Sequence, residues 1–486
     1  MAIANCESPP RGSRYIPNVH TWVRKHRRLL LGTALAGLAL RLFFFFHFPA
    51  VTDDSRLYAD IASNWLQHGV YGQTQAGRVV PTDERLPGYP AFLAAMFALF
   101  GTGNLKAALL VQILFDLGTC MVIADLARRT ISDRAAVLSF ALACACPFLA
   151  NYAGAALTET LEMFFTVVAL DCAVAGLDLL GTNSHAWPGW RAWSACGAAI
   201  GTCILLRPDG GILLAAVEFY LLFLIGKAVR GKRPGNNNVR ALVRAAALVA
   251  LLSLAPLAPW TMRNFRTLHH FQPLAPRYAT GQEEFAAGGF NRWVKTWIAD
   301  YSSTEEFYWS MPGEQLDATK LPNRAFDSPA QRDATLALLD GYNQSNTMSR
   351  DLDAGFAALA AERIRAHPLR YYIGLPLVRI ADMWLRPRTE ILPPDPRWWE
   401  FDDLPSSSAT VIGLGLLNLA YVALASLTLL CRRDALRYLG LLALFLVLRS
   451  AFLGSLENPE PRYTLECYPA VIVWAAAYFA RPTKRP

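Results

Sequence analysis

The sequence predicts an all-α protein that crosses a membrane about ten times or more. Hydrophobic residues make up 53% of the 486 positions and charged residues only 17%, which is too apolar for a water-soluble enzyme of several domains. The apolar residues gather in runs that are long enough to cross a bilayer. The net charge of +8 comes mostly from cations in short loops between these runs, where they set topology. A nucleic-acid partner is therefore not expected.

Ten apolar runs are predicted as membrane spans. They are 29–50, 105–127, 135–150, 160–180, 193–206, 209–226, 244–262, 408–430, 437–454 and 464–480. The first holds Arg41 and His47 and is followed by acidic residues rather than by a small-residue cleavage site, so we expect a permanent anchor. The apolar run 87–101 is short and is predicted to lie on the membrane surface, because a full crossing there would invert every later loop.

Lysines and arginines gather in alternate loops, which fixes the predicted orientation. Because positively charged loops stay in the cytoplasm, both termini are predicted to be cytoplasmic. The resulting divisions are a basic tail 1–28, a transmembrane core 29–262 that includes the outer loop 51–104, an outer domain 263–407, C-terminal transmembrane helices 408–480 and a tail 481–486.

The two outer segments have different patterns. In the first, Leu57, Ile61 and Trp65 fall on one helical stripe, which is typical of an amphipathic helix on the membrane surface. The second is rich in tryptophan and tyrosine and predicts a small α-rich domain with juxtamembrane helices. Neither segment contains a cysteine, so disulfides do not hold them.

Charged residues collect at the outer ends of the predicted spans. They are Asp53, Asp54, Arg85, Glu159, Arg207, Arg263, Glu457, Glu460 and Arg462. Guanidinium groups match the oxygens of a phosphate, and a carboxylate can accept a proton from an attacking group. This set suits a reaction between a lipid-linked anion and a hydroxyl or amine at the membrane surface. The adjacent carboxylates Asp53 and Asp54 are the leading candidates for the active site, because charge at that depth is costly unless it has a partner.

Several short motifs carry a family resemblance between about Val51 and Pro469. They are Asp54–Ala62, Trp65–Gly69, Arg85–Pro90, Leu157–Glu159, Leu206–Pro208, Pro259–Asn264 and Pro461–Tyr463. In this order they resemble blocks of the GT-C membrane glycosyltransferases, especially the protein mannosyltransferase and aminoarabinose transferase-like branch, which is similar to glycosyltransferase family 39.

The resemblance implies a transferase that takes a sugar from a polyprenyl-phosphate donor, with inversion, on the outer side of the membrane. It implies Asp54 as the general base. The alternative base is Asp53. Arg56 lies at the family's spacing from Asp53, whereas Tyr58 and Ala62 lie at the family's spacing from Asp54.

The remaining site residues are assigned to the donor phosphate or to the pocket around it. The predicted phosphate ligands are Arg85, Arg263, Arg462 and Arg207, and the other site residues are Tyr58, Tyr89, Glu159 and Tyr463. The predicted partners are a polyprenyl-phosphate sugar, membrane lipids and a protein, lipid or glycan acceptor. No cofactor or metal is required by the sequence, although a divalent cation between Asp53 or Asp54 and the phosphate stays open.

Structural roles compete with these assignments. Thr52, Asp53 or Asp54 is placed to cap the surface helix, and an arginine at the end of a span often reaches lipid headgroups. The aromatic cluster between Trp293 and Trp309 is more typical of a domain core than of a sugar platform.

Two other classes of protein remain as alternatives. They are a lipid-to-polymer glycan ligase or polymerase, and a secondary transporter or flippase, which should carry paired broken helices and charge near mid-membrane. A bacterial inner membrane with the active site on its periplasmic face is the expected location.

Overall fold

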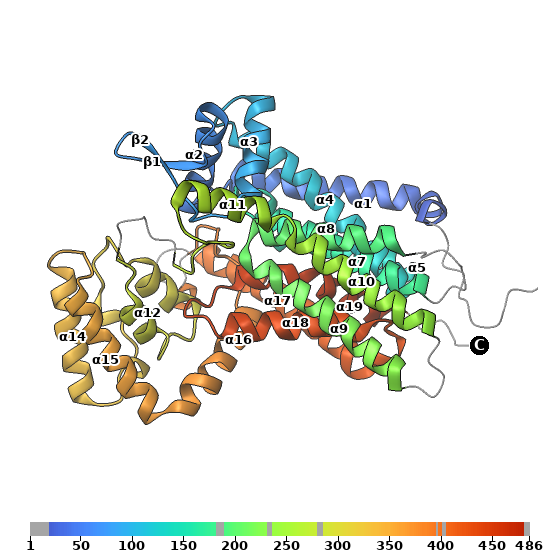
Figure 1. The fold of residues 1–486 in the computed structure, drawn as a ribbon. Helices are drawn as coiled ribbons and strands as arrows, with labels where there is room; N and C mark the ends of the chain where they lie inside the picture. The colour runs from blue at the N-terminus through green and yellow to red at the C-terminus, as the bar shows by residue number, and fades with distance from the viewer. Residues whose placement is uncertain are drawn as a thin grey trace, which may run out of the picture.

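The computed structural model describes residues 19–180, 189–230, 236–278, 285–394, 397–400 and 405–480. Residues 1–18 and 481–486, where the cytoplasmic tails are predicted, lie outside this part of the chain. Figure 1 shows a bundle of long helices with a smaller helical domain, drawn in yellow and orange, at one end. In the described residues the only sheet is a hairpin of β1 (Gly72–Gln75) and β2 (Arg78–Pro81). The predicted all-α class is confirmed.

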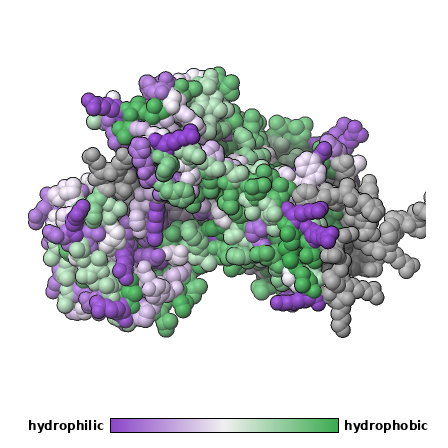
Figure 2. Space-filling model, in the orientation of Figure 1, coloured by the Kyte–Doolittle hydropathy of each residue, from purple (hydrophilic) through white to green (hydrophobic). Residues whose placement is uncertain are grey.

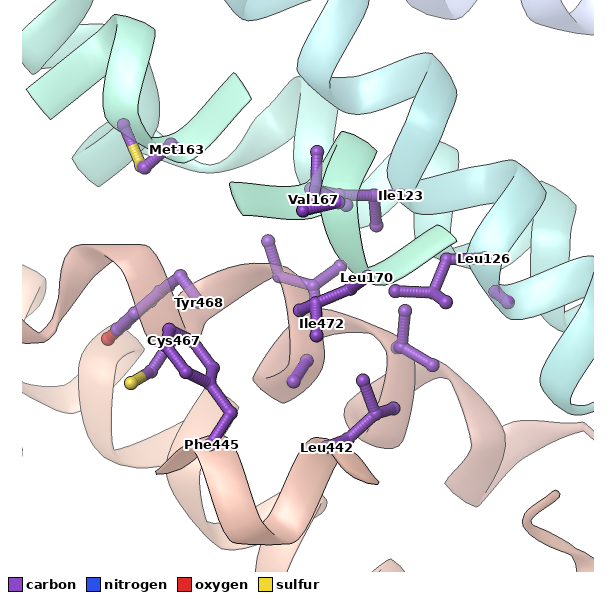
Figure 3. Close-up of a cluster of buried hydrophobic side chains, with 14 of the residues drawn as sticks. Ile123, Leu126, Met163, Val167, Leu170, Leu442, Phe445, Cys467, Tyr468 and Ile472 are labelled. Carbon is purple, nitrogen blue, oxygen red and sulfur yellow. The ribbon is translucent and has the colours of Figure 1, made fainter. Parts of the chain in front are cut away.

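The bundle combines helices from both ends of the chain. From the N-terminal part come α1 (Val19–His47), α4 (Leu105–Thr130), α5 (Asp133–Ala145), α6 (Pro147–Ala153), α7 (Glu159–Leu180), α8 (Trp190–Leu206), α9 (Gly211–Arg230) and α10 (Asn236–Leu254), and from the C-terminal part α17 (Pro405–Cys431), α18 (Leu439–Gly454) and α19 (Tyr468–Phe479). Figure 3 shows their shared core, in which side chains of α4 and α7 meet those of α18 and α19. Helices from the two ends of the chain are thus packed together.

Many large apolar side chains of the bundle face outward. Leu114, Phe223, Leu416 and Leu430 are all more than 60% exposed. Figure 2 shows this as a green middle section, with purple side chains gathered toward the two ends. Such a surface is stable against lipid rather than water, so the chain is an integral membrane protein.

The spans are fewer and more broken than the apolar runs predict. Within the described residues, six helices are long and apolar enough to cross a membrane, and a seventh is added if the bent pair α5 and α6 is one span. The predicted run 135–150 bends by 53° at this pair, because Pro147 lacks the N–H that a continuous helix would use there. Helices α8, α18 and α19 have only 17, 16 and 12 residues.

The first outer loop has the predicted surface helix, α2 (Asp53–His68), followed by the hairpin and by α3 (Gly88–Phe100). Thr52 caps α2 by accepting a hydrogen bond from the N–H of Ser55, so neither aspartate is the cap residue. The 13 residues of α3 make a helix about 20 Å long, shorter than the hydrocarbon core, which favours the surface position. Gly88 lets α3 begin against α8, since a Cβ there would lie 2.6 Å from the carbonyl of Leu205.

The outer domain follows α11 (Leu257–Leu268), which comes directly after α10 in the chain. Its elements are α12 (Gly288–Val294), α13 (Tyr301–Ser303), the π-helical η2 (Thr304–Trp309), η3 (Ala318–Lys320), η4 (Asn323–Ala325), α14 (Pro329–Asn343) and α15 (Arg350–Ala366). The chain then returns to the bundle through η5 (Arg370–Gly374), α16 (Leu375–Leu385) and η6 (Trp398–Glu400). Trp293, Trp297 and Phe307 are buried in its core. The prediction that this aromatic cluster forms a domain core is confirmed for these three residues. Trp309, in contrast, is 46% exposed and lies outside that core.

Candidate active site

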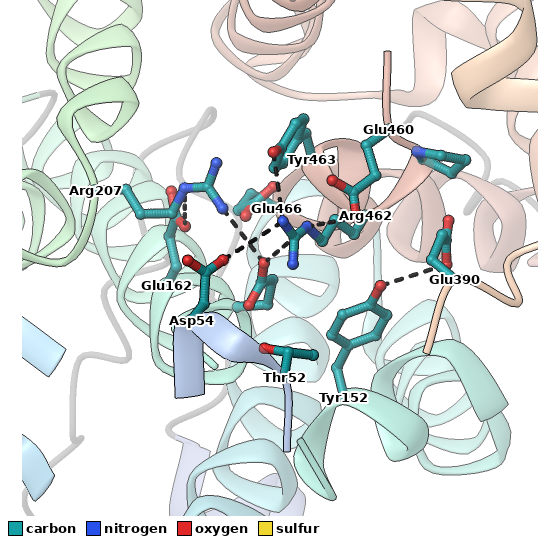
Figure 4. Close-up of polar contacts among 12 residues, drawn as sticks. Thr52, Asp54, Tyr152, Glu162, Arg207, Glu390, Glu460, Arg462, Tyr463 and Glu466 are labelled. Atoms are coloured by element: carbon teal, nitrogen blue, oxygen red, sulfur yellow. Dashed lines mark hydrogen bonds and ion pairs between the residues drawn. The ribbon is translucent and has the colours of Figure 1, made fainter. Parts of the chain in front are cut away.

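Charged side chains from five separate segments meet where the bundle joins the outer domain. Asp54 comes from the first turn of α2, Arg85 from the loop before α3, Glu159 from the start of α7 and Arg207 from the end of α8. Arg462 comes from the 3₁₀ helix η8 (Pro461–Cys467), just before α19. Figure 4 shows Asp54, Arg207 and Arg462 pointing toward one another. The structure brings Asp54, Arg85, Glu159, Arg207 and Arg462 together in one network of ion pairs, and their assignment as site residues stays a prediction.

Asp54 lies between two arginines. Its carboxylate is 2.6 Å from Nη2 of Arg85 and 3.9 Å from Nη2 of Arg462, and its side chain is 29% exposed. Burial raises the pKa of this carboxyl, but the combined attraction of Arg85 and Arg462 outweighs burial and holds the pKa below its usual value. Asp54 is therefore ionised, and it remains accessible to a ligand.

Asp53 points away from this pocket. Its side chain is 96% exposed and pairs with Arg56 at 2.6 Å on the outer face of α2. Adjacent residues of a helix differ in direction by about 100°, which explains why only one of the two carboxylates enters the site.

Arg462 connects Asp54 to more deeply buried carboxylates. Its Nε is 2.6 Å from Glu460 and 3.7 Å from Glu159. Arg207 contacts the same oxygen of Glu159 at 3.3 Å, so this one carboxylate lies between two guanidinium groups. Burial raises the pKa of Glu460 to about 7, against the opposing attraction of Arg462.

Arg207 connects the site to a second group of charged side chains. Arg207 also contacts Asp209 at 3.2 Å and Glu162 at 3.6 Å. Arg449 of α18, itself buried, contacts Glu466 at 2.8 Å, Asp209 at 3.0 Å and Glu162 at 3.7 Å. Arginines and carboxylates therefore alternate from the interior of the bundle to Asp54.

The carboxylates in this network outnumber the arginines. Asp54, Glu159, Glu162, Asp209, Glu460 and Glu466 face Arg85, Arg207, Arg449 and Arg462. Both side-chain oxygens of Glu162 and of Glu466, and one each of Glu159 and Glu460, accept no hydrogen bond from any described residue. A surplus of buried negative charge is costly, so the network favours bound protons or an added cation.

Aromatic rings line the same pocket. Tyr463 lies under the guanidinium groups of Arg207, at 4.6 Å, and Arg462, at 5.2 Å, and Trp309 lies 5.4 Å from Arg462. Tyr58 packs edge-on against Tyr89, whose hydroxyl donates to Gln112 at 2.6 Å. Tyr89 is thus fully buried behind Tyr58.

Arg263 is held apart from the Asp54 pocket. Its guanidinium donates to the carbonyl of Thr82 at 2.7 Å and to the carbonyl of Tyr71. It lines a mostly apolar cavity of about 660 Å³ between the first outer loop and α11, together with Trp65, Val70, Leu205, Pro256 and Trp260. Tyr71 joins the two sites, because its ring lines this cavity and its hydroxyl donates to the carbonyl of Arg85 at 2.8 Å.

Sequence reasoning missed the deeper part of the network. Arg449 and Glu466 stand inside predicted spans, and charge at such a position is a recognised sign of function or of a buried partner. That signal was present for both residues and also for Glu162. Glu390, which accepts a hydrogen bond from Tyr152 at 3.3 Å, gave no comparable signal, because it follows α16 in a loop.

Among the residues that the structure describes, no group of three or more His, Cys, Asp and Glu side chains is arranged to hold an ion. His270, one of two adjacent histidines, instead contacts Asp83 at 2.7 Å.

Comparison with known proteins supports the family resemblance. Residues 81–261 match the family model of the dolichyl-phosphate-mannose-protein mannosyltransferases, a stretch that contains Arg85, Glu159 and Arg207. A search of curated proteins gave no match.

Solved structures of similar fold were also found. The archaeal oligosaccharyltransferase AglB from Archaeoglobus fulgidus, solved with an inhibitory peptide and a dolichol-phosphate, is 14% identical, with a TM-score of 0.50 over 94% of this chain. This chain covers 50% of the length of AglB. ArnT from Cupriavidus metallidurans is 18% identical, with a TM-score of 0.35 over 93% of this chain and 78% of ArnT. Residues 81–261 therefore resemble this mannosyltransferase family, and the fold of the chain is similar to that of AglB.

Proposed function

We propose that the protein is a membrane glycosyltransferase that moves a sugar from a polyprenyl-phosphate donor to an acceptor, with Asp54 as the general base. The observation that carries this proposal is the position of Asp54 between Arg85 and Arg462, where the bundle meets the outer domain. A base and two phosphate-binding groups are thus within reach of one small substrate.

The donor phosphate is proposed to bind Arg85 and Arg462, with Arg207 in support. Guanidinium groups offer paired N–H donors to phosphate oxygens, and they stabilise the negative charge that grows on a departing phosphate. Arg263 is engaged with two backbone carbonyls, so we place it at the rim of the apolar cavity rather than on the phosphate.

Donor binding and base strength are coupled in this arrangement. In the free protein the two arginines hold the pKa of Asp54 low, which makes it a weak base. A bound phosphate competes for the same guanidinium groups and adds a negative charge nearby. Both effects raise the pKa of Asp54, so the base gains strength when the donor is in place.

The proposed reaction is a single displacement at the anomeric carbon. The acceptor oxygen attacks this carbon from the face opposite the phosphate, and the bond from the carbon to the phosphate oxygen breaks. Polyprenyl phosphate leaves with the electron pair of that bond, and the proton of the acceptor hydroxyl passes to Asp54. The anomeric configuration is inverted.

The apolar cavity beside Arg263 is a candidate site for the isoprenoid tail. It is lined mainly by apolar and aromatic side chains, and it shares Tyr71 with the pocket that contains Arg85. Met262 and Phe265 of α11 are more than half exposed nearby, as expected for a helix at the lipid interface. A tail in this cavity would bring its phosphate toward Arg85.

Orientation and location extend the proposal. The clustering of cations in alternate loops supports an outer, periplasmic position for Asp54 and cytoplasmic termini, in a bacterial inner membrane. The dolichol-phosphate in the archaeal oligosaccharyltransferase of similar fold supports a polyprenyl-phosphate ligand.

The adjacent aspartates provide a matched test. Purified protein would be incubated with a polyprenyl-phosphate monosaccharide and candidate acceptors, and released polyprenyl phosphate would be measured. Asp54→Asn should lower turnover by about 10² to 10⁴-fold, the usual contribution of a general base. Asp53→Asn removes the same charge one residue away on an exposed face and should leave turnover within about twofold, because an exposed pair contributes little. Equal losses in both variants would overturn the base assignment.

The same assay separates the alternative functions. A flippase would move the lipid donor across the bilayer without releasing polyprenyl phosphate. A polymerase or ligase would release the lipid carrier only while it joins glycan units into a longer chain.

A further inference from the structure

A second cavity lies on the other side of the outer domain's junction with the bundle. Its volume is about 520 Å³. Its walls come from the start of the outer domain, from α16 and from η6, and they include Asp300, Arg324, Asp382, Arg386, Trp398 and Trp399. None of these side chains makes a contact described above for Asp54, so this cavity is separate from the proposed reaction centre.

The charges in this second cavity are balanced. Arg324 pairs with Asp300, and Arg386 lies 3.6 Å from Asp382. Two arginines and two carboxylates give no net attraction for a phosphate or another anion. Hydroxyl groups fit such a wall well, because a hydroxyl can accept from a guanidinium and donate to a carboxylate at the same time.

Tryptophan supplies an apolar platform beside these polar groups. Trp399 is 43% exposed, and the guanidinium of Arg386 lies 5.4 Å from its ring. Sugar rings present C–H groups on their faces and hydroxyl groups around their edge. An aromatic ring flanked by hydrogen-bonding groups matches both parts.

The rim of the cavity is apolar. Val378 and Leu385 of α16 line the cavity and are each about half exposed. Neighbouring α17 carries exposed leucines of the lipid-facing surface, such as Leu416. Figure 1 places α16 beside α18 at the end of the bundle that faces the outer domain. A ligand that enters here meets polar groups and lipid-facing groups together.

A short stretch of the outer domain connects this cavity to the reaction centre. Arg386 is 5.6 Å from the ring of Tyr301. Burial raises the pKa of the Tyr301 hydroxyl, and the nearby charges of Glu460 and Arg462 also act on it. Tyr301 begins a continuous stretch, α13 and η2, that ends at Trp309, whose ring lies 5.4 Å from the guanidinium of Arg462, the arginine that contacts Asp54.

We propose that this cavity binds a neutral sugar ring of a glycolipid acceptor and holds that acceptor beside the reaction centre. The neutral pairs Asp300–Arg324 and Asp382–Arg386 would bind the hydroxyl groups, and Trp399 would stack on the ring. The assignment to the acceptor rests on the proposed function, whereas binding of a sugar-bearing lipid can be measured independently of transfer.

Native mass spectrometry of the purified full-length protein tests this binding. The probes are glucosyl-, galactosyl- and mannosyl-diacylglycerol, compared with plain diacylglycerol and phosphatidylglycerol of the same chains. At least one hexosyl lipid should bind about tenfold more tightly than diacylglycerol, and Trp399→Ala and Asp382→Asn should remove that preference. Free methyl hexoside should compete for the site if the sugar alone is recognised, whereas competition only by the lipid form would show that the chains also contribute.

Trp190→Ala is the matched control. Trp190 is also half exposed and also carries an arginine near its ring, Arg191 at 5.5 Å, but it begins α8 at the other end of the bundle. This variant should bind the hexosyl lipid as the wild type does. Equal binding of all lipids, a preference for phosphatidylglycerol, or equal losses in Trp190→Ala and Trp399→Ala would overturn the proposal.

The result stays distinct from the fate of the proposed function. Hexosyl-lipid binding should persist in Asp54→Asn, which lacks transfer. Transfer without any hexosyl-lipid preference would refute this inference alone, and binding without any release of polyprenyl phosphate would refute the proposed function.

Discussion

Replacing Arg449 by methionine tests whether the buried charge network supports the site. Methionine keeps most of the apolar volume of the arginine stem and removes its charge. Arg449 contacts Glu466, Asp209 and Glu162 at 2.8, 3.0 and 3.7 Å, and its Nε donates to the carbonyl of Tyr463 at 2.9 Å. The substitution therefore leaves three buried carboxylates without their shared cation.

The expected loss of stability is large. Removing one partner of a buried ion pair typically lowers the free energy of unfolding by about 3–5 kcal/mol, because the remaining charge is left without compensation. Replacing Glu466 by glutamine in the same protein removes the nearest of these charges. The double variant should recover about 1–3 kcal/mol of the loss.

Activity should fall as well, for a geometric reason. Without Arg449, Asp209 and Glu162 are attracted by Arg207 alone, which would draw Arg207 away from Glu159 and Tyr463. A displacement of about 1 Å at a site of this kind costs on the order of a hundredfold in kcat/KM.

Equilibrium unfolding in lipid bicelles and the polyprenyl phosphate release assay would measure the two effects. Arg41→Met is the control, since Arg41 is also fully buried and pairs with Asp116 at 2.6 Å between α1 and α4, away from the site. It should lose comparable stability and keep the wild-type kcat/KM in its folded fraction. The reasoning fails if Arg449→Met unfolds like the wild type, or if Arg41→Met loses the same activity.

Two further predictions concern the pocket itself. Because the pKa of Glu460 is raised to about 7, Glu460 becomes neutral below that pH and releases Arg462. The phosphodiester of a polyprenyl-phosphate sugar keeps its charge in this range. The affinity of the protein for this donor should therefore rise as the pH falls from 8 to 6. Glu460→Gln should bind the donor equally well at both pH values, and a pH dependence that survives in this variant would contradict the role of Glu460. Tyr71→Phe removes the hydrogen bond to the carbonyl of Arg85. In steady-state release assays this variant should raise the KM for the donor about fivefold, with kcat nearly unchanged. An unchanged KM would show that Tyr71 does not hold Arg85.

The main features of the fold follow from residue patterns that are local in the chain. Long apolar runs, alternating basic loops and the stripe of Leu57, Ile61 and Trp65 predict the spans and the surface helix. The break at Pro147 was missed because hydropathy averages over a window, whereas a helix bends at a single missing N–H. The predicted runs 437–454 and 464–480 do contain α18 and α19, but the helices are shorter than the runs.

The site could be predicted only in outline. The ends of the spans indicated that Asp54, Arg85 and Arg462 would meet, because membrane topology places them at the same depth. The sequence did not separate Asp53 from Asp54, since the choice depends on where α2 begins and thus on its cap, Thr52. It also could not exclude Arg263 from the pocket, because two backbone carbonyls of the first outer loop hold that side chain.

The distance along the chain between Asp209 and Arg449 has a consequence for biogenesis. The two residues form a buried ion pair but are separated by 240 positions. At a synthesis rate of about 5–20 residues per second, the ribosome delivers Arg449 roughly ten to fifty seconds after Asp209 has emerged. During that interval Glu162 and Asp209 have Arg207 as a partner but still lack Arg449. The early helices must therefore wait beside the translocation channel or an insertase, and a chain truncated before α18 should be a substrate for membrane quality-control proteases.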